Sequence, residues 1–192
     1  PKEFALSWHE KYKQTFLGMS IEFDNYGHTD DEVNTLLTRE IVRTLDASNH
    51  IYDKDILVAW DPVEDQPLPD RYVEGVCPHC GANARGDECD DGCQRHLEPG
   101  EILNPKSIIT GNEAEYRSKS HKFFRISDFQ DYLQEFINRL EGTTNAKNQP
   151  REWIEGSLLD WCITRNIDWG ISYPGEEETD LVLYVWVDAV VE

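Results

Sequence analysis

Four cysteines in two close pairs are the feature that most restricts how this chain folds. Within its 192 residues, Cys77 and Cys80 form one pair, Cys89 and Cys93 the other, and eight residues separate the pairs. This spacing can place four thiolates around a tetrahedral Zn²⁺ at about 2.3 Å each, and four protein ligands leave no position for water. The intervening residues have too little apolar surface to offset their chain entropy. The sequence therefore predicts one zinc ion with a structural, non-catalytic role.

The second cysteine pair leaves alternatives open for the ligand set. Its C-x3-C spacing is one residue longer than is usual for a zinc knuckle, and His79 and His96 lie near enough in sequence to replace a thiolate. Redox-active or disulfide-bonded cysteines are the remaining interpretation. The chain has five cysteines, of which four fall within 17 residues. Because an odd total with tight clustering is typical of a metal site in a reducing compartment, we expect a cytoplasmic protein. The fifth cysteine, Cys162, is interpreted as a buried core thiol.

The chain carries a large acidic excess, with a net charge of −20 from 38 acidic and 18 basic residues. This charge repels phosphate backbones, which argues against a general nucleic-acid-binding module. Its dispersal along the chain is typical of proteins adapted to high salt, with an ordinary acidic cytosolic protein as the alternative. The longest apolar run, 181–187, is too short to cross a membrane, and no secretory signal opens the chain, so no membrane association is expected.

Apolar residues at helical spacing predict four helices. The first covers 2–16, and the second follows a capping box at Thr29. The third begins at Ser127, and the fourth begins near Pro150, after a loop over 142–150. The side chains that these patterns predict to be buried in the second and third helices are Val33, Leu36, Leu37, Ile41 and Leu45, then Phe129, Tyr132, Leu133, Phe136, Ile137 and Leu140.

The rest of the chain has a β-rich character. Pro and Gly at short intervals between the second and third helices predict short strands and turns around the metal. The apolar run 181–187 predicts a strand buried on both faces, as in a parallel sheet. We therefore expect an α+β fold in four segments: a helical lead-in over 1–50, a β-rich zinc-knuckle subdomain over 51–126, a helical return over 127–162, and strands over 163–192.

Several stretches of sequence, taken in order, match the pattern of one family. Three of them surround the knuckle: 70–81 (DRYVEGVCPHCG), 86–89 (GDEC) and 97–107 (LEPGEILNPKS). Others agree in the same order: 21–26 (IEFDNY), 162–170 (CITRNIDWG) and 184–189 (YVWVDA). They resemble the zinc-knuckle insertion, and the adjoining part of the catalytic domain, of methionyl-tRNA synthetases, and the resemblance covers nearly the whole chain.

This resemblance implies a fold and an activity. It implies part of a class I aminoacyl-tRNA synthetase, a ligase that uses ATP and Mg²⁺ to activate methionine and transfers it to tRNA(Met). It also implies that the chain is an insertion in a split Rossmann-type catalytic domain that is mostly absent here. The residues that match family positions are the zinc ligands Cys77, Cys80, Cys89 and Cys93, the methionine-pocket residues Val185, Trp186 and Ala189, and Arg165, which faces the active site and could hold carboxylate or phosphate oxygens.

Departures from the family pattern limit what the chain does alone. The two class I signatures that bind ATP, of the HIGH and KMSKS types, are absent, so we expect no catalytic residues in this segment and no activity without the remainder of the catalytic domain. The expected proline after Ala189 is also missing. The alternative is a free-standing zinc-knuckle module, derived from a synthetase, that binds a partner without catalysis. The parent open reading frame would discriminate between the two.

Overall fold

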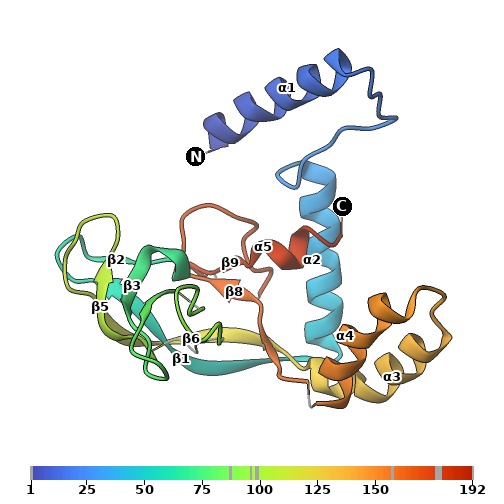
Figure 1. Ribbon diagram of the computed structural model, residues 1–192. Coiled ribbons are helices and arrows are strands. Elements are labelled where there is room, and N and C mark those ends of the chain that lie inside the picture. The colour runs from blue at the N-terminus through green and yellow to red at the C-terminus, as the bar shows by residue number, and fades with distance from the viewer. Residues whose placement is uncertain are drawn as a thin grey trace. The chain divides into compact units, whose positions relative to one another are not determined.

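The computed structural model describes residues 2–86, 88–95, 97, 100–156, 158–175 and 179–191, and its fold is mixed α/β (Figure 1). The chain divides into two compact units. One, here called the helical unit, comprises 1–52 and 122–192, and the other, the knuckle unit, comprises 53–121. Two strands, β1 (Ile51–Asp61) and β6 (Glu115–Phe124), contribute residues to both units, within a sheet of order β2-β1-β6-β7. The other members of this sheet are β2 (Gln66–Pro67) and β7 (Trp161–Cys162).

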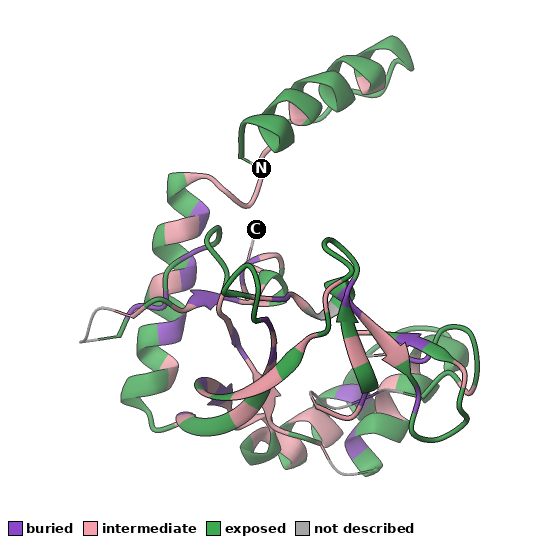
Figure 2. Ribbon diagram, turned by 90° about the vertical axis from the view of Figure 1, so that its left-hand side faces the viewer, coloured by how far each residue is buried: buried purple, intermediate pink, exposed green. Residues whose placement is uncertain are grey.

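The first helix forms where the aromatic spacing predicts it. Helix α1 (Lys2–Gly18) ends at its glycine, and none of its described residues is buried (Figure 2). Phe4, Trp8 and Tyr12 form a row along one exposed side, with neighbouring rings tilted and their centroids 6.1 and 5.5 Å apart. Phe16 instead packs edge-on against Phe23, from the segment that follows the helix. The periodicity therefore predicts the helix correctly, but its aromatic row is not part of a core.

The second helix, α2 (Glu32–Ala47), corrects two expectations. Its N-cap is Asp31 rather than Thr29, because the Asp31 carboxylate accepts the backbone N–H of Asn34 at 2.7 Å. Its buried residues are Asn34, Thr38 and Val42, and α5 (Val185–Asp188) packs against this helix. The predicted apolar stripe is exposed, with Val33, Leu36, Leu37 and Ile41 all open to solvent. Helical periodicity identifies which side chains share one face of a helix, but it does not show which face is buried by other residues of this chain.

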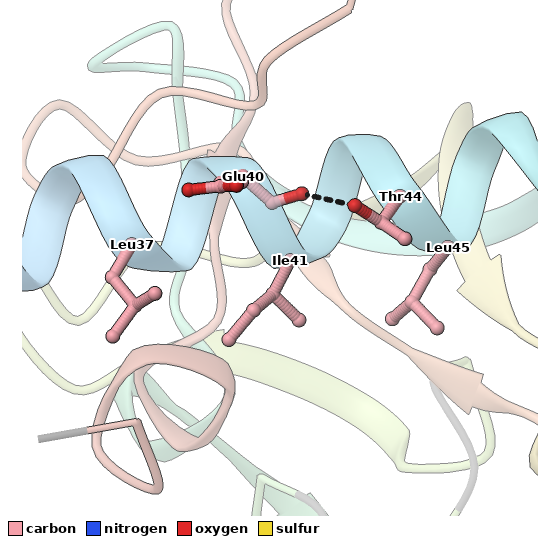
Figure 3. Close-up of a pocket in the computed structure, with 5 residues that line it drawn as sticks. All are labelled: Leu37, Glu40, Ile41, Thr44 and Leu45. Carbon is pink, nitrogen blue, oxygen red and sulfur yellow. Dashed lines mark hydrogen bonds between the residues drawn. The ribbon is translucent and has the colours of Figure 1, made fainter.

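Leu37, Ile41 and Leu45 point from the same side of α2 and, with Glu40 and Thr44, line an open groove of about 280 Å³ (Figure 3). Leu45 lies at the edge of this face, where it also packs against the buried cluster of the helical unit. The buried members of that cluster are Val42, Ile51, Ile163, Ile171, Tyr173 and Leu183.

The helical return differs from its prediction at both helices. After a 3₁₀ turn, η2 (Ile126–Phe129), helix α3 spans Gln130–Arg139, and of its predicted core residues only Ile137 is buried. Tyr132, Phe136 and Leu140 are exposed. The predicted loop over 142–150 is wrong, because α4 (Thr144–Glu155) begins there and contains Pro150. The Thr143 side chain caps it by accepting the N–H of Ala146, a start signal hidden in a polar stretch.

The C-terminal run is not the predicted parallel strand. Within this run the described strand is β9 (Val182–Leu183), which pairs antiparallel with β8 (Thr164–Arg165) in a two-stranded sheet. The chain then turns into α5, so Val185 and Trp186 lie on a short helix. A run of apolar residues alone does not separate a buried strand from a strand followed by a helix.

The knuckle unit contains a small antiparallel sheet of order β4-β3-β5. Its strands are β3 (Val73–Val76), β4 (Asn83–Arg85) and β5 (Leu103–Ser107), preceded by a 3₁₀ turn, η1 (Asp70–Tyr72). Its buried cluster consists of Ala59, Leu68, Val73, Cys77, Ala84, Cys89, Leu97 and Ile102. Two of the cysteines are therefore part of the unit's core. Within the described ranges, no helix combines the length and apolarity needed to cross a membrane.

Candidate metal centre

The first cysteine pair lies in a tight turn between β3 and β4. The N–H of Gly81 donates to the Cys77 carbonyl at 3.0 Å, and the N–H of Cys77 donates to the Ala82 carbonyl at 2.9 Å. Gly81 has φ +76°, a left-handed conformation that glycine adopts without the penalty that a side chain brings. The turn returns the chain antiparallel, with Val76 opposite Asn83, and leaves both cysteines at one end of the strand pair.

The second pair lies in a turn that brings its sulfurs to the first. The N–H of Gln94 donates to the Cys89 carbonyl at 3.0 Å, which closes the longer loop between Cys89 and Cys93. The four Sγ atoms lie within 4.8 Å of one another. Cys77 and Cys93 are 3.8 Å apart, and Cys80 and Cys89 are 3.6 Å apart.

These separations fit a metal of the zinc type. A regular tetrahedron with metal–sulfur distances of about 2.3 Å has sulfur–sulfur edges of about 3.8 Å. A disulfide requires sulfurs about 2.05 Å apart, and all five cysteines of the chain are free. The structure therefore brings together the four predicted ligands in a set that could hold one metal ion.

Histidine does not enter this set in the described part of the chain. The group of His, Cys, Asp and Glu atoms that meets the same distance limit consists of the four cysteines, so His79 does not belong to it. His96 lies outside the described residues. The geometry therefore favours four thiolates over the substitution of His79 for one of them.

The four thiols have unequal environments. Cys77 and Cys89 are buried, Cys93 is half-buried and Cys80 is exposed. The backbone N–H of Ala82 donates to the Cys80 sulfur and lowers the pKa of that thiol to about 6. Burial raises the pKa of Cys89 to about 12. Because a metal ligand must be the thiolate, a bound cation would have to stabilise the negative charge that burial disfavours on the Cys89 sulfur.

Charged side chains beside the second pair were not identified from the sequence. Arg71, from η1, lies 3.1 Å from the Asp90 carboxylate and 3.6 Å from that of Glu88. It therefore pairs with the residues on both sides of Cys89. The charges of Arg71, Glu88 and Asp90 are visible in the sequence, but 17 to 19 residues separate Arg71 from its partners, and nothing local predicts their contact.

The predicted methionine-pocket residues lie in the helical unit. Val185 and Trp186 are exposed on α5, and Ala189 follows directly as the C-cap of that helix. Arg165, on β8, places its guanidinium 4.0 Å from the ring of Tyr184, the residue before α5. Its Nη1 also donates to the carbonyls of Cys162 and Thr164, at 3.2 and 2.9 Å. The sequence identified Arg165 as a site residue, and Tyr184 only as part of the stretch 184–189. The contact between the two residues follows from the pairing of β8 with β9.

Comparisons with known proteins place the whole chain in one group. The family described as tRNA synthetases class I (M) matches residues 1–192. The methionine–tRNA ligases of the halophiles Haloarcula marismortui and Halobacterium salinarum are each 65% identical to it. Both alignments include all of this chain but only 27% and 28% of the relatives. The enzyme of Archaeoglobus fulgidus is 51% identical over 98% of this chain and 28% of its own length.

A solved structure agrees at the level of the fold. Methionyl-tRNA synthetase of Mycobacterium tuberculosis, in complex with methionyl-adenylate, superposes with a TM-score of 0.59, over 94% of this chain and 31% of that one. Its sequence identity of 22% limits this likeness to the fold. The family match and the relatives at 65% identity both extend over the full sequence, so the chain belongs to the methionyl-tRNA synthetase family of class I tRNA synthetases.

Proposed function

We propose that this chain contributes the zinc-bearing insertion of a methionyl-tRNA synthetase and one wall of its methionine pocket. The observation that carries the proposal is the set of four sulfurs within 4.8 Å of one another, in a chain 65% identical over its full length to methionine–tRNA ligases. The parent reaction joins methionine to tRNA(Met) at the expense of ATP, with Mg²⁺, in the cytoplasm. The chain spans about 27% of the length of these relatives, so this activity is attributed to the longer protein.

The metal in this proposal is one Zn²⁺, held by Cys77, Cys80, Cys89 and Cys93. Zinc bound to four thiolates supplies folding free energy and, with no ligand position open, no reaction chemistry. The Ala82 N–H helps to hold the Cys80 sulfur in its charged form. Arg71 forms exposed ion pairs with the carboxylates on both sides of Cys89. The centre thus orders the knuckle unit and takes no part in the chemical step.

The methionine pocket in this proposal is lined by Val185, Trp186 and Ala189. Val185 and Trp186 are 54% and 58% exposed, so their apolar surface is available to a ligand or to another part of the protein. A thioether packs favourably against an aromatic ring, which suits Trp186 to methionine. The Arg165 guanidinium is held against Tyr184 and by two carbonyls, an arrangement that would aim a fixed positive charge at carboxylate or phosphate oxygens.

The partner that completes the fold is the remainder of the catalytic domain. The groove on α2 exposes Leu37, Ile41 and part of Leu45, and apolar rows of this kind usually mark a contact surface (Figure 3). The relatives are more than three times as long as the part that this chain matches. We therefore assign ATP, Mg²⁺ and tRNA(Met) to the assembled enzyme, and we expect the chain alone to be inactive.

Two measurements on the chain test these assignments. Elemental analysis is expected to find one zinc per chain, and methionine-dependent ATP–pyrophosphate exchange is expected to stay at background. A chain without metal would contradict the zinc site, and exchange above background would contradict inactivity. The pocket is tested in the longer protein, where Trp186→Ala is expected to raise KM for methionine. Trp153→Ala is the matched control, because Trp153 is equally exposed but lies on α4, and KM should not change.

A further inference from the structure

Gly92 lies against the sulfurs of the proposed zinc site. A Cβ atom added to it would lie 2.6 Å from the Cys80 Sγ and 3.0 Å from the Cys89 Sγ. It would also lie 2.7 Å from the Cβ of Ala82. Each of these separations is shorter than van der Waals contact allows, which is about 3.5–4.0 Å between carbon atoms. A side chain at this position therefore competes for space with two of the four ligands.

Backbone conformation is not what requires glycine at this position. The glycines with positive φ are Gly81, Gly86, Gly100 and Gly111, and Gly92 is not among them. Gly81 gives the reverse case, because its φ is +76° but a Cβ there would meet nothing within 4 Å. The turn of the first pair thus needs glycine for its conformation, whereas the turn of the second pair needs it for room.

The unusual spacing of the second pair explains why room is short. Between Cys89 and Cys93 the loop holds three residues, Asp90, Asp91 and Gly92, one more than in a C-x2-C turn. The loop must still close, as the bond from the Gln94 N–H to the Cys89 carbonyl requires. The additional length is accommodated by setting the last loop residue directly against the sulfurs of Cys80 and Cys89.

We propose that Gly92 is a positioning residue of the metal centre: its missing side chain allows the Cys80 and Cys89 sulfurs to reach their tetrahedral places in spite of the longer loop. This inference rests on the proposed zinc site. It identifies the residue that makes a C-x3-C pair compatible with four-thiolate coordination. Gly92 is not a ligand, and it acts only through the two cysteines that it contacts.

A methyl group at Gly92 would weaken the metal-bound state more than the metal-free state. Without metal, a cysteine sulfur can leave a crowded position by rotation about χ1. A bound metal fixes both sulfurs, so the crowding cannot be relieved in this way. The contact with the Ala82 Cβ is different, because a Cβ moves only with its backbone and is crowded in both states. Metal affinity changes only if the added methyl group destabilises the metal-bound and metal-free states by different amounts. The contacts with the two sulfurs should therefore lower metal affinity. The contact with Ala82 should mainly lower the stability of the fold.

The experiment measures Zn²⁺ affinity, by competition with a chelator, for the chain and for Gly92→Ala. A loss of about tenfold or more, equivalent to at least 1.4 kcal/mol, is expected. Co²⁺ in place of Zn²⁺ gives a second measurement, because its visible absorption reports tetrahedral thiolate coordination, and these bands should weaken or shift in Gly92→Ala. Gly142→Ala is the matched control, since a Cβ there meets nothing within 4 Å, and it should leave both measurements unchanged.

A second pair of variants separates the sulfur contacts from the Ala82 contact and remains useful if Gly92→Ala folds poorly. Ala82→Gly removes the rigid neighbour, and Ala82→Gly/Gly92→Ala then places a methyl against the sulfurs alone. The double variant should bind Zn²⁺ more weakly than Ala82→Gly does. Equal affinity in the two would overturn the inference, as would wild-type affinity and Co²⁺ bands in Gly92→Ala. A wild-type chain that binds no Zn²⁺ would instead contradict the metal site itself.

Discussion

The knuckle unit counts Cys77 and Cys89 among its buried residues, whereas the helical unit leaves whole rows of apolar side chains exposed. In the knuckle unit, strands β3, β4 and β5 are short, and the turns that hold the sulfurs are closed by backbone hydrogen bonds. In the helical unit, α2 buries Asn34 and Thr38 but exposes Leu37 and Ile41. In the proposed function, the first region is completed by an ion that its own residues could hold, and the second by the remainder of the catalytic domain.

Removal of the metal should have the largest effect and should divide the molecule along this comparison. Zinc bound by four thiolates supplies about 10 kcal/mol or more of apparent folding free energy at neutral pH. Chelation should therefore disorder the turns around Cys77 and Cys89, while α2 and α3 keep their structure because their packing does not involve the site. Amide hydrogen exchange, followed by segment with and without chelator, measures this difference.

Cysteine variants refine the same test. Cys77→Ser and Cys80→Ser should each lose the metal, and Cys162→Ser should retain it, because Cys162 lies outside the sulfur cluster. Cys93→Ser is the most informative of these variants, because the C-x3-C spacing leaves the fourth ligand open between Cys93 and a histidine. If the Cys93→Ser chain binds zinc as tightly as the wild type, a histidine is the fourth ligand. If chelation reduced the protection of backbone amides from hydrogen exchange equally in α2 and in the turns around Cys77 and Cys89, the expected difference between the two units would be contradicted.

Salt should act on both regions together. The net charge of −20 produces self-repulsion that destabilises the compact state at low ionic strength. Raising KCl from 0.1 M towards molar concentrations should therefore raise Tm by roughly 2–4 °C, which corresponds to about 1 kcal/mol for a chain of this size. Thermal unfolding followed by circular dichroism measures the shift. A flat or falling Tm would contradict the high-salt interpretation.

Two neighbouring residues of α2 provide a narrower test of its two faces. Val42 is 1% exposed and Ile41 is 39% exposed. In this chain Val42→Ala should cost about 2 kcal/mol of unfolding free energy through cavity formation, whereas Ile41→Ala should cost roughly 0.5 kcal/mol. Urea unfolding measures both values. In a longer protein that contains the remainder of the catalytic domain, the cost of Ile41→Ala should approach that of Val42→Ala. An Ile41→Ala cost that stays small there would show that this face is not a contact surface.

The smallest expected effect concerns Asp61, a fully buried carboxylate at the end of β1 in the knuckle unit. Hydrogen bonds from the Thr110 hydroxyl, from the N–H groups of Val63 and Glu64, and from the Asn112 amide hold its pKa below the ordinary value. A depressed pKa in the folded state stabilises the fold above the ordinary pKa, and this contribution is lost as the pH falls through the folded value.

The fall in Tm between pH 7 and pH 3 should therefore be smaller in Asp61→Asn than in the wild type, although the variant starts from a lower Tm at pH 7. Asp55→Asn, on the exposed part of the same strand, is the control and should reproduce the wild-type profile. Parallel Tm profiles for Asp61→Asn and the wild type would contradict a stabilising role for the ionised carboxylate.

Sequence patterns predicted best where one kind of residue imposes one arrangement. Four closely spaced cysteines predicted the sulfur cluster, and the row Phe4, Trp8, Tyr12 predicted α1. They predicted least where the outcome depends on distant residues. The apolar face of α2 was visible in the sequence, but its exposure depends on what else the polypeptide contains. The fourth helix was predicted, but its start was placed near Pro150 instead of at Thr144, because Pro150 was interpreted as a first-turn residue rather than as an interior one.

The candidate site shows the same limit. The ligands were predicted from spacing, but Arg71 and Gly92 were not, because each acts through a contact made by tertiary folding. The additional residue before Cys93 was the only local signal that something near it must be small. Likewise, Arg165 was identified by family resemblance, while its contact with Tyr184 depends on a two-stranded sheet that no local pattern predicts.

The exposure of Cys80 has a consequence for the rate at which the centre exchanges its metal. Cys80 is the most exposed of the four cysteines, whereas Cys77 and Cys89 are covered by the protein. Chelators and oxidants would therefore reach the Cys80 sulfur first, and in the metal-free chain its lowered pKa favours the reactive thiolate form. In the proposed centre, equilibrium affinity would depend on all four thiolates together, whereas the lifetime of a bound Zn²⁺ would depend also on how readily the exposed Cys80 sulfur is released.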